Sequence, residues 1–117
     1  MAGYYEGNYE SKGSILAHPD GYSAFPQTVS STDPAVVTED GVKVLKGGTV
    51  YPANDATAKG IVLQDYPIDA DGNAQAAIVY IGDIRGTALI EGLTDEAKSA
   101  LTGIHVFGTS PAAPPQA

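Results

Sequence analysis

The chain has 117 residues, the length of one domain, and it contains no cysteine, so disulfides and thiolate metal sites are excluded. Its net charge is −8, with six basic against fourteen acidic residues, which excludes the cationic surfaces that nucleic acids and anionic membranes require. Glycine and proline are frequent (14 and 8 residues) and only 17% of residues are charged, which favours short strands and tight turns over a helical bundle.

Residues 1–35 show no sustained helical or strand period and are predicted to form an extended N-terminal arm, with a turn at Pro19-Asp20-Gly21. The arm also carries the short apolar run Ile15-Leu16-Ala17. Two interpretations stay open: the arm folds back over its own domain and caps the core, or it becomes ordered on another protein. Five of the nine aromatic residues lie in this arm, namely Tyr4, Tyr5, Tyr9, Tyr22 and Phe25.

Residues 36–110 are predicted to form a compact β-rich domain. Val36-Val37 begins a short strand that ends in a turn at Glu39-Asp40-Gly41. The segments 42–45 and 49–51 flank Lys46-Gly47-Gly48 and are predicted to pair as a hairpin.

Three further strands are predicted before the helix. Ile61-Val62-Leu63 is a continuous apolar run typical of a buried strand, and Ala76–Ile81 is the strongest strand pattern in the chain. Tyr66-Pro67-Ile68 is expected at a sheet edge or bend, because proline cannot donate a hydrogen bond to a neighbouring strand.

A short helix is predicted to begin at Thr94, whose hydroxyl suits an N-cap followed by two acidic residues. Ala97 and Leu101 are spaced to face the core, and Gly103 suits the residue that ends the helix. Ile104–Phe107 is predicted as a closing strand, and residues 111–117 as a flexible proline-rich tail. The expected fold is therefore α+β and mainly β: a small barrel or sandwich of short strands with one short helix.

The sequence predicts no catalytic, cofactor or metal site. Asp69-Ala70-Asp71-Gly72-Asn73 resembles the start of a calcium loop but lacks its later ligands, which favours a turn. His18 and His105 have no nucleophile motif around them. The stretch 82–86 lacks the spacing of a phosphate-binding loop and is interpreted as a loop in which Arg85 pairs with Asp83 or with a neighbouring subunit.

Residues 60–107 resemble the head decoration proteins of lambda-type tailed phages in the order and spacing of short motifs. The matching pieces are Gly60-Ile61-Val62-Leu63, Asp69-Ala70-Asp71, Ala77–Ile81, Gly82-Asp83-Ile84, Ala88-Leu89, Asp95–Leu101 and Gly103-Ile104-His105-Val106. The resemblance implies a non-catalytic virion protein that binds the major capsid protein on the outer surface of the expanded head. It also implies homotrimers that stabilise the shell, with an N-terminal arm that adds to capsid-protein strands.

On this hypothesis the arm residues Tyr4, Tyr5, Tyr9, Ile15 and Leu16 are the predicted capsid contacts. Tyr66, Pro67 and Arg85 are the predicted trimer contacts, chosen as an edge-type strand and a loop charge. The start of the chain has neither a basic nor an apolar signal region, and no apolar run reaches the length of a membrane span, so synthesis in the host cytoplasm is expected.

Two other classes of function remain open. Exposed tyrosines on a β scaffold suit a host-surface or glycan-binding module of a phage or bacterial appendage. A small calcium-dependent or hydrolytic enzyme is the second alternative, and it would depend on Asp71.

Overall fold

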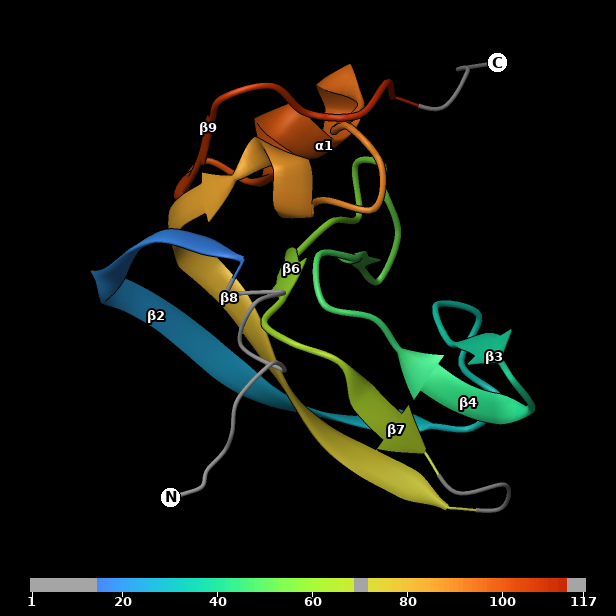
Figure 1. Ribbon diagram of the computed structural model, residues 1–117. Coiled ribbons are helices and arrows are strands. Elements are labelled where there is room, and N and C mark those ends of the chain that lie inside the picture. Colours follow the sequence, from blue (N-terminus) through green and yellow to red (C-terminus); the bar gives the residue numbers. More distant parts are fainter. Residues whose placement is uncertain (1–14, 69–71, 114–117) are drawn as a thin grey trace.

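The computed structural model describes residues 15–68 and 72–113 and confirms a mainly β domain with one short helix (Figure 1). A 3-10 turn, η2, spans Gly86–Ala88, and the α-helix, α1, spans Asp95–Ala100. The strands are β2 (Leu16–Ser30), β3 (Val37–Glu39), β4 (Val42–Leu45), β5 (Val50–Tyr51), β6 (Gly60–Val62), β7 (Tyr66–Ile68), β8 (Asn73–Arg85) and β9 (Ile104–Phe107).

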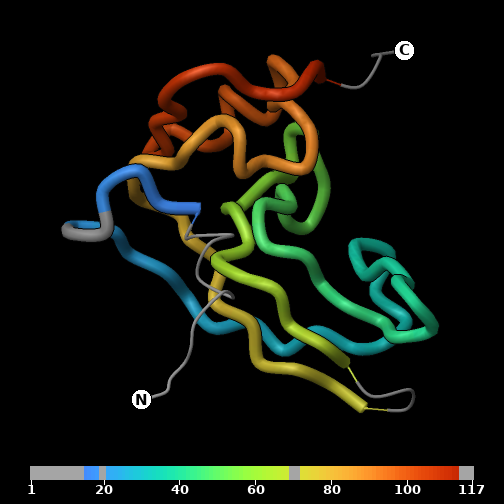
Figure 2. The backbone as a smooth tube through the Cα atoms, in the orientation of Figure 1, coloured from blue at the N-terminus to red at the C-terminus, as the bar shows by residue number. Residues whose placement is uncertain are grey.

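The larger sheet has five strands and is built on the long antiparallel pair of β2 and β8. The strand order is β2-β8-β6-β5, and β9 lies beside β8 in parallel, beyond the end of β6. Ile84 near the end of β8 is paired with both Leu16 and Val106, so the beginning of β2 and β9 meet at the same end of the sheet (Figure 2).

The predicted turn at residues 19–21 lies inside β2 as an irregularity. Residues 19–22 stand opposite Gly82 alone, between the paired positions His18↔Asp83 and Ser23↔Ile81. Gly21 has φ +84°, a left-handed conformation that glycine adopts without a steric cost. This bulge bends β2 and leaves the strand paired with β8 on both sides of it.

The smaller sheet has three strands in the order β3-β4-β7, so β7 is an edge strand as predicted. Asp40 and Gly41 both have positive φ and form the expected turn between β3 and β4. The predicted hairpin of segments 42–45 and 49–51 is wrong. β4 pairs with β3 and β7, whereas β5 pairs with β6 in the other sheet, so the intervening glycines carry the chain from one sheet to the other.

The core consists of two clusters, to which β6 and β8 both contribute because successive strand residues point to opposite faces. Ile61 and Val79 belong to the first cluster, while Val62 and Ile78 belong to the second. The first cluster is completed by Ile15, Leu16, Val50, Ala58, Ile84, Leu89, Ala97 and Leu101. The second is completed by Val29, Leu45, Tyr51, Ile68 and Ala76, and so includes residues of both sheets.

Helix α1 closes the first cluster as its sequence predicts. The Thr94 hydroxyl accepts a hydrogen bond from the Ala97 backbone N–H at 3.1 Å, and Ala97 and Leu101 are buried. Gly103, however, is not a left-handed helix-ending residue. It is a point of close approach, because a Cβ there would come within 2.7 Å of the Tyr80 carbonyl oxygen.

Two other expectations require correction. Residues 16–30 form β2, and Ile15, Leu16 and Val29 lie in the core, so residues 15–35 belong to the fold and do not form an extended arm. Residues 82–85 are not a loop, because they form the last part of β8 and pair with β9. The start of the predicted tail also packs on the domain: the Gly92 N–H donates to the Ala112 carbonyl at 3.3 Å.

Candidate functional site

Exposed aromatic side chains gather where β2, β8 and β9 run beyond β6. We call this region the aromatic end of the sheet, defined by His18, Tyr22, Tyr80, Asp83 and Phe107, together with the half-buried Phe25, which lies level with β6 and packs on the second cluster. Tyr22, Tyr80 and Phe107 keep 38%, 42% and 47% of their surface exposed. Ile81, between Tyr80 and Gly82, is also exposed. Concentrated exposed rings of this kind are typical of protein surfaces that a partner covers.

The side chains at the aromatic end make two ring contacts. The rings of Phe25 and Tyr80 lie 6.0 Å apart, and those of His18 and Phe107 lie 5.4 Å apart edge to face. The His18 Nδ1 also lies 2.8 Å from a carboxylate oxygen of Asp83, so one imidazole links all three strands. The region is thus held together by contacts between β2, β8 and β9.

Glycines and irregular pairing create this region. A Cβ at Gly82 would lie 3.1 Å from the Cβ of Tyr22, so glycine allows the bulged part of β2 to lie close against β8. Gly82 and Gly103 are also joined by a backbone hydrogen bond of 3.0 Å, which places β9 against β8.

The tyrosines of the second cluster have a different role. Tyr51 is buried, and its hydroxyl donates a hydrogen bond to the Asp33 carboxylate at 2.8 Å. Burial is the main cause that raises the pKa of Tyr51 to about 12, and the neighbouring Asp33 carboxylate raises it further. The Tyr66 hydroxyl oxygen accepts the Ala77 backbone N–H at 3.0 Å. Both hydroxyls therefore satisfy groups of the fold itself.

The predicted capsid contacts are divided by the structure. Tyr4, Tyr5 and Tyr9 lie outside the described residues. Ile15 and Leu16 are only 6% and 8% exposed and pack in the first cluster. Their apolar side chains are buried in the core of this domain and expose almost no surface to a partner, which favours the interpretation that this part of the arm folds over its own core.

The three predicted trimer contacts are not brought together. Pro67 is exposed on edge strand β7, and Tyr66 beside it is half-buried with its hydroxyl used internally. Arg85 lies at the far end of β8, where it is paired with Phe107 of β9 and its backbone N–H donates to the Ile15 carbonyl at 2.7 Å (Figure 1). Asp83 bonds His18 in the structure, and the pairing of Arg85 with Asp83 or with a neighbouring subunit stays a prediction.

Sequence reasoning missed Tyr80 and Phe107, although both lie in strands that it predicted. The period of a strand says which residues share a face but not which part of that face is covered. The clustering of arm aromatics pointed to Tyr22 and Phe25, which the structure places beside Gly82 and Tyr80 respectively.

Within residues 15–68 and 72–113, no group of three histidine, aspartate or glutamate side chains is arranged to hold a metal ion. The aspartates of the possible calcium loop, Asp69 and Asp71, lie outside the described residues. Among the described helices, none is long and apolar enough to cross a membrane.

Comparison of the chain with protein-family models, with curated protein sequences and with solved structures finds no match.

Proposed function

We propose that this chain is a capsid decoration protein, which binds the major capsid protein on the outer surface of an expanded phage head as trimers and stabilises the shell without catalysis. The observation that carries the binding part of this proposal is the aromatic end of the sheet. Tyr22, Tyr80 and Phe107 expose large rings there. A surface of this chemistry gains free energy when a partner covers it.

The resemblance of residues 60–107 to lambda-type decoration proteins supplies the identity of the partner. Its motifs fall on elements that pack together: Gly60–Val62 is β6, the run Ala77–Ile84 is in β8, and residues 104–106 are in β9. The compact β domain agrees with what the resemblance implies about the fold. The acidic surface is compatible with a position outside the DNA-filled shell.

The proposed mechanism is mechanical. A decoration protein that contacts several capsid subunits lowers the free energy of the expanded lattice by its total binding energy, so the lattice resists internal pressure. Trimeric binding places three copies of the same contact around one lattice position. Rigid contacts favour this role, and the aromatic end lies on three hydrogen-bonded strands and not on a loop.

The test is co-sedimentation of the purified chain with expanded, undecorated heads of the corresponding phage. The full chain is expected to saturate heads in multiples of three per lattice position. The double variant Tyr22→Ser/Tyr80→Ser is expected to bind about thirtyfold more weakly, the scale of losing one strong contact residue. Val42→Ser is the matched control, because Val42 is 51% exposed but lies in the smaller sheet.

Failure of the full chain to bind heads would overturn the proposal. The N-terminal contribution is tested with a chain that starts at Ser14, since starting at Pro34 would delete β2 and its core residues. Weak binding by this variant, with unchanged thermal unfolding, would show that residues 1–13 contribute to capsid binding. Equal binding would place the contact within the folded domain.

The same exposed tyrosines favour a second candidate, a host-surface or glycan-binding module. Tyrosine rings present an apolar face with a polar hydroxyl, a combination that stacks on sugar rings as well as on protein. Retention on a neutral polysaccharide, lost in Tyr22→Ser/Tyr80→Ser, together with no head binding, would support this alternative.

A further inference from the structure

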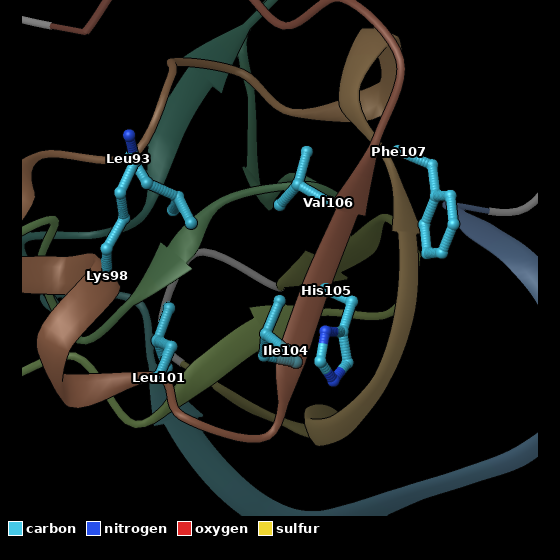
Figure 3. Close-up of a pocket in the computed structure, with 7 residues that line it drawn as sticks. All are labelled: Leu93, Lys98, Leu101, Ile104, His105, Val106 and Phe107. Atoms are coloured by element: carbon cyan, nitrogen blue, oxygen red, sulfur yellow. The ribbon is translucent and has the colours of Figure 1, made fainter.

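A second surface feature lies next to β9, and Phe107 of the aromatic end also contributes to its margin. It is an open groove of about 390 Å³ between helix α1 and β9 (Figure 3). This volume falls in the range of small-molecule sites. The groove is lined by Leu93, Lys98, Leu101, Ile104, His105, Val106 and Phe107.

The groove has an apolar interior. Leu101 is 4% exposed, and Ile104 and Val106 are half-buried, so the groove opens directly above the first core cluster. Leu93, Leu101, Ile104 and Val106 lie on the helix side of β9, whereas His105 and Phe107 project from its other side at the margin (Figure 3). Leu93 and Leu101 flank α1, which Thr94 caps, and Ile104 and Val106 lie in β9, which is paired with β8.

Among the described residues that line the groove, Lys98 alone carries an ammonium group. Its side chain extends beside Leu93 with the amine at the outer end, so the apolar stem follows the wall and the ammonium stays at the opening (Figure 3). Within residues 15–68 and 72–113, the Lys98 ammonium has no ion pair, in contrast to Lys46, which pairs with Glu39 and Asp65. Lys43 and Lys59 also lack a described ion pair, so what distinguishes Lys98 is its position beside the aliphatic side chains of the groove.

We propose that this groove binds a small aliphatic monocarboxylate, such as a medium-chain fatty acid, with its chain against the four aliphatic residues and its carboxylate on Lys98. Charge complementarity selects the head group, because the ammonium donates hydrogen bonds and accepts none. The apolar lining selects an aliphatic tail over a polar one. The inference stands independently of head binding, because it uses Lys98, Leu93 and Leu101 and none of the exposed tyrosines.

The probe is sodium octanoate, titrated into isotope-labelled protein and followed by the methyl NMR signals of the leucine, isoleucine and valine residues. We expect saturable shifts at Leu93, Leu101, Ile104 and Val106, with a dissociation constant on the order of 1 mM, given the few atoms buried in an open groove. Octyltrimethylammonium, which has the same tail and the opposite charge, is expected to bind at least about fivefold more weakly.

Lys98→Gln is expected to weaken octanoate binding roughly fivefold, the scale of a solvent-exposed ion pair, while leaving the shifted residues the same. The matched control Lys59→Gln makes the same charge change at an exposed lysine outside the groove and is expected to bind as the parent does. Absence of saturable shifts at the groove overturns the proposal. Equal binding of the two surfactants, or equal loss in both lysine variants, overturns the role of Lys98 and with it the proposed ligand class.

Discussion

The two halves of β8 differ in what covers them. The first half, up to Ile78, contributes to the second cluster, which the smaller sheet helps to enclose, and Ala76 and Ile78 are buried. The second half extends past β6, and there Tyr80 and Ile81 are more than two-fifths exposed although they continue the same strand. The second half also contributes Val79 and Ile84, both fully buried, to the first cluster, so it is open only around Tyr80 and Ile81.

The tyrosine side chains of the two regions also differ in whether their hydroxyls bond within the fold or their rings are exposed. Tyr51 and Tyr66, which belong to or pack on the second cluster, use their hydroxyls to bond Asp33 and the Ala77 backbone. Tyr22 and Tyr80 are exposed at the aromatic end. The proposed function assigns the exposed side chains of the second half to contact and the buried side chains of both halves to stability, and the following variants test that division.

The largest expected difference is between two residues that are two positions apart on β8. Ile78→Ala should lower the free energy of unfolding by about 2–5 kcal/mol, because it leaves a cavity in a fully buried site. Tyr80→Ala should lower it by less than about 1 kcal/mol, because the ring is 42% exposed. Urea unfolding of both variants measures this; equal losses would show that the aromatic end is part of the core.

The next effect concerns the buried tyrosine of the second cluster. Tyr51→Phe removes a hydrogen bond to the Asp33 carboxylate and should cost about 1.5–3 kcal/mol, the range for bonds to charged groups. Urea unfolding at neutral pH measures the loss. A loss of less than about 0.5 kcal/mol, the scale of a surface substitution, would contradict a stabilising role for this hydrogen bond.

Tyr51 also predicts a pH dependence. Its folded-state pKa of about 12 lies above the usual value of 10.0, so the phenol holds its proton in the folded chain while the unfolded chain loses it. This contribution to stability is fully present below about pH 10 and is lost as the pH rises through about 12. Unfolding measured across that window should show a steeper decline for the parent than for Tyr51→Phe, and parallel curves would contradict the raised pKa.

The cap of α1 tests the cover of the first cluster. Thr94 accepts the Ala97 N–H and donates to the Asn54 carbonyl at 3.0 Å, so Thr94→Ala should cost about 1–2 kcal/mol. Thr94→Ser keeps the hydroxyl and should recover most of that loss. Thermal unfolding compares the two, and equal melting temperatures for serine and alanine would show that the hydroxyl does not cap the helix.

The sequence predicted correctly the elements that are determined by interactions between residues close together in the chain. The bounds of β4 and β9 and the cap at Thr94 follow from apolar runs, turn residues and hydroxyl chemistry that act within a few residues. β2 was missed because Pro19, Gly21 and Pro26 interrupt its pattern. The strand tolerates them because it lies at the edge of its sheet and bulges around Gly21.

Pairing between strands could not be predicted in the same way. The glycines after β4 suit a hairpin, but β5 joins β6, and only the packed structure decides between these partners. The candidate site could not be predicted from the sequence for the same reason. In the sequence, Tyr80 and Phe107 are ordinary strand residues. They form an exposed site only because the smaller sheet and β6 do not reach the end of β8.

The smallest expected effect is at the polar pair of the aromatic end. His18 and Asp83 are partly exposed, so Asp83→Asn should change the free energy of unfolding by less than about 1 kcal/mol, as solvated ion pairs usually do. The same variant should alter head binding by a larger factor if this end is covered by a partner, because an interfacial polar group loses its water on binding. Urea unfolding and co-sedimentation of one preparation compare the two effects. A large stability loss with unchanged binding would reverse the assignment of the exposed side chains of β8 to contact.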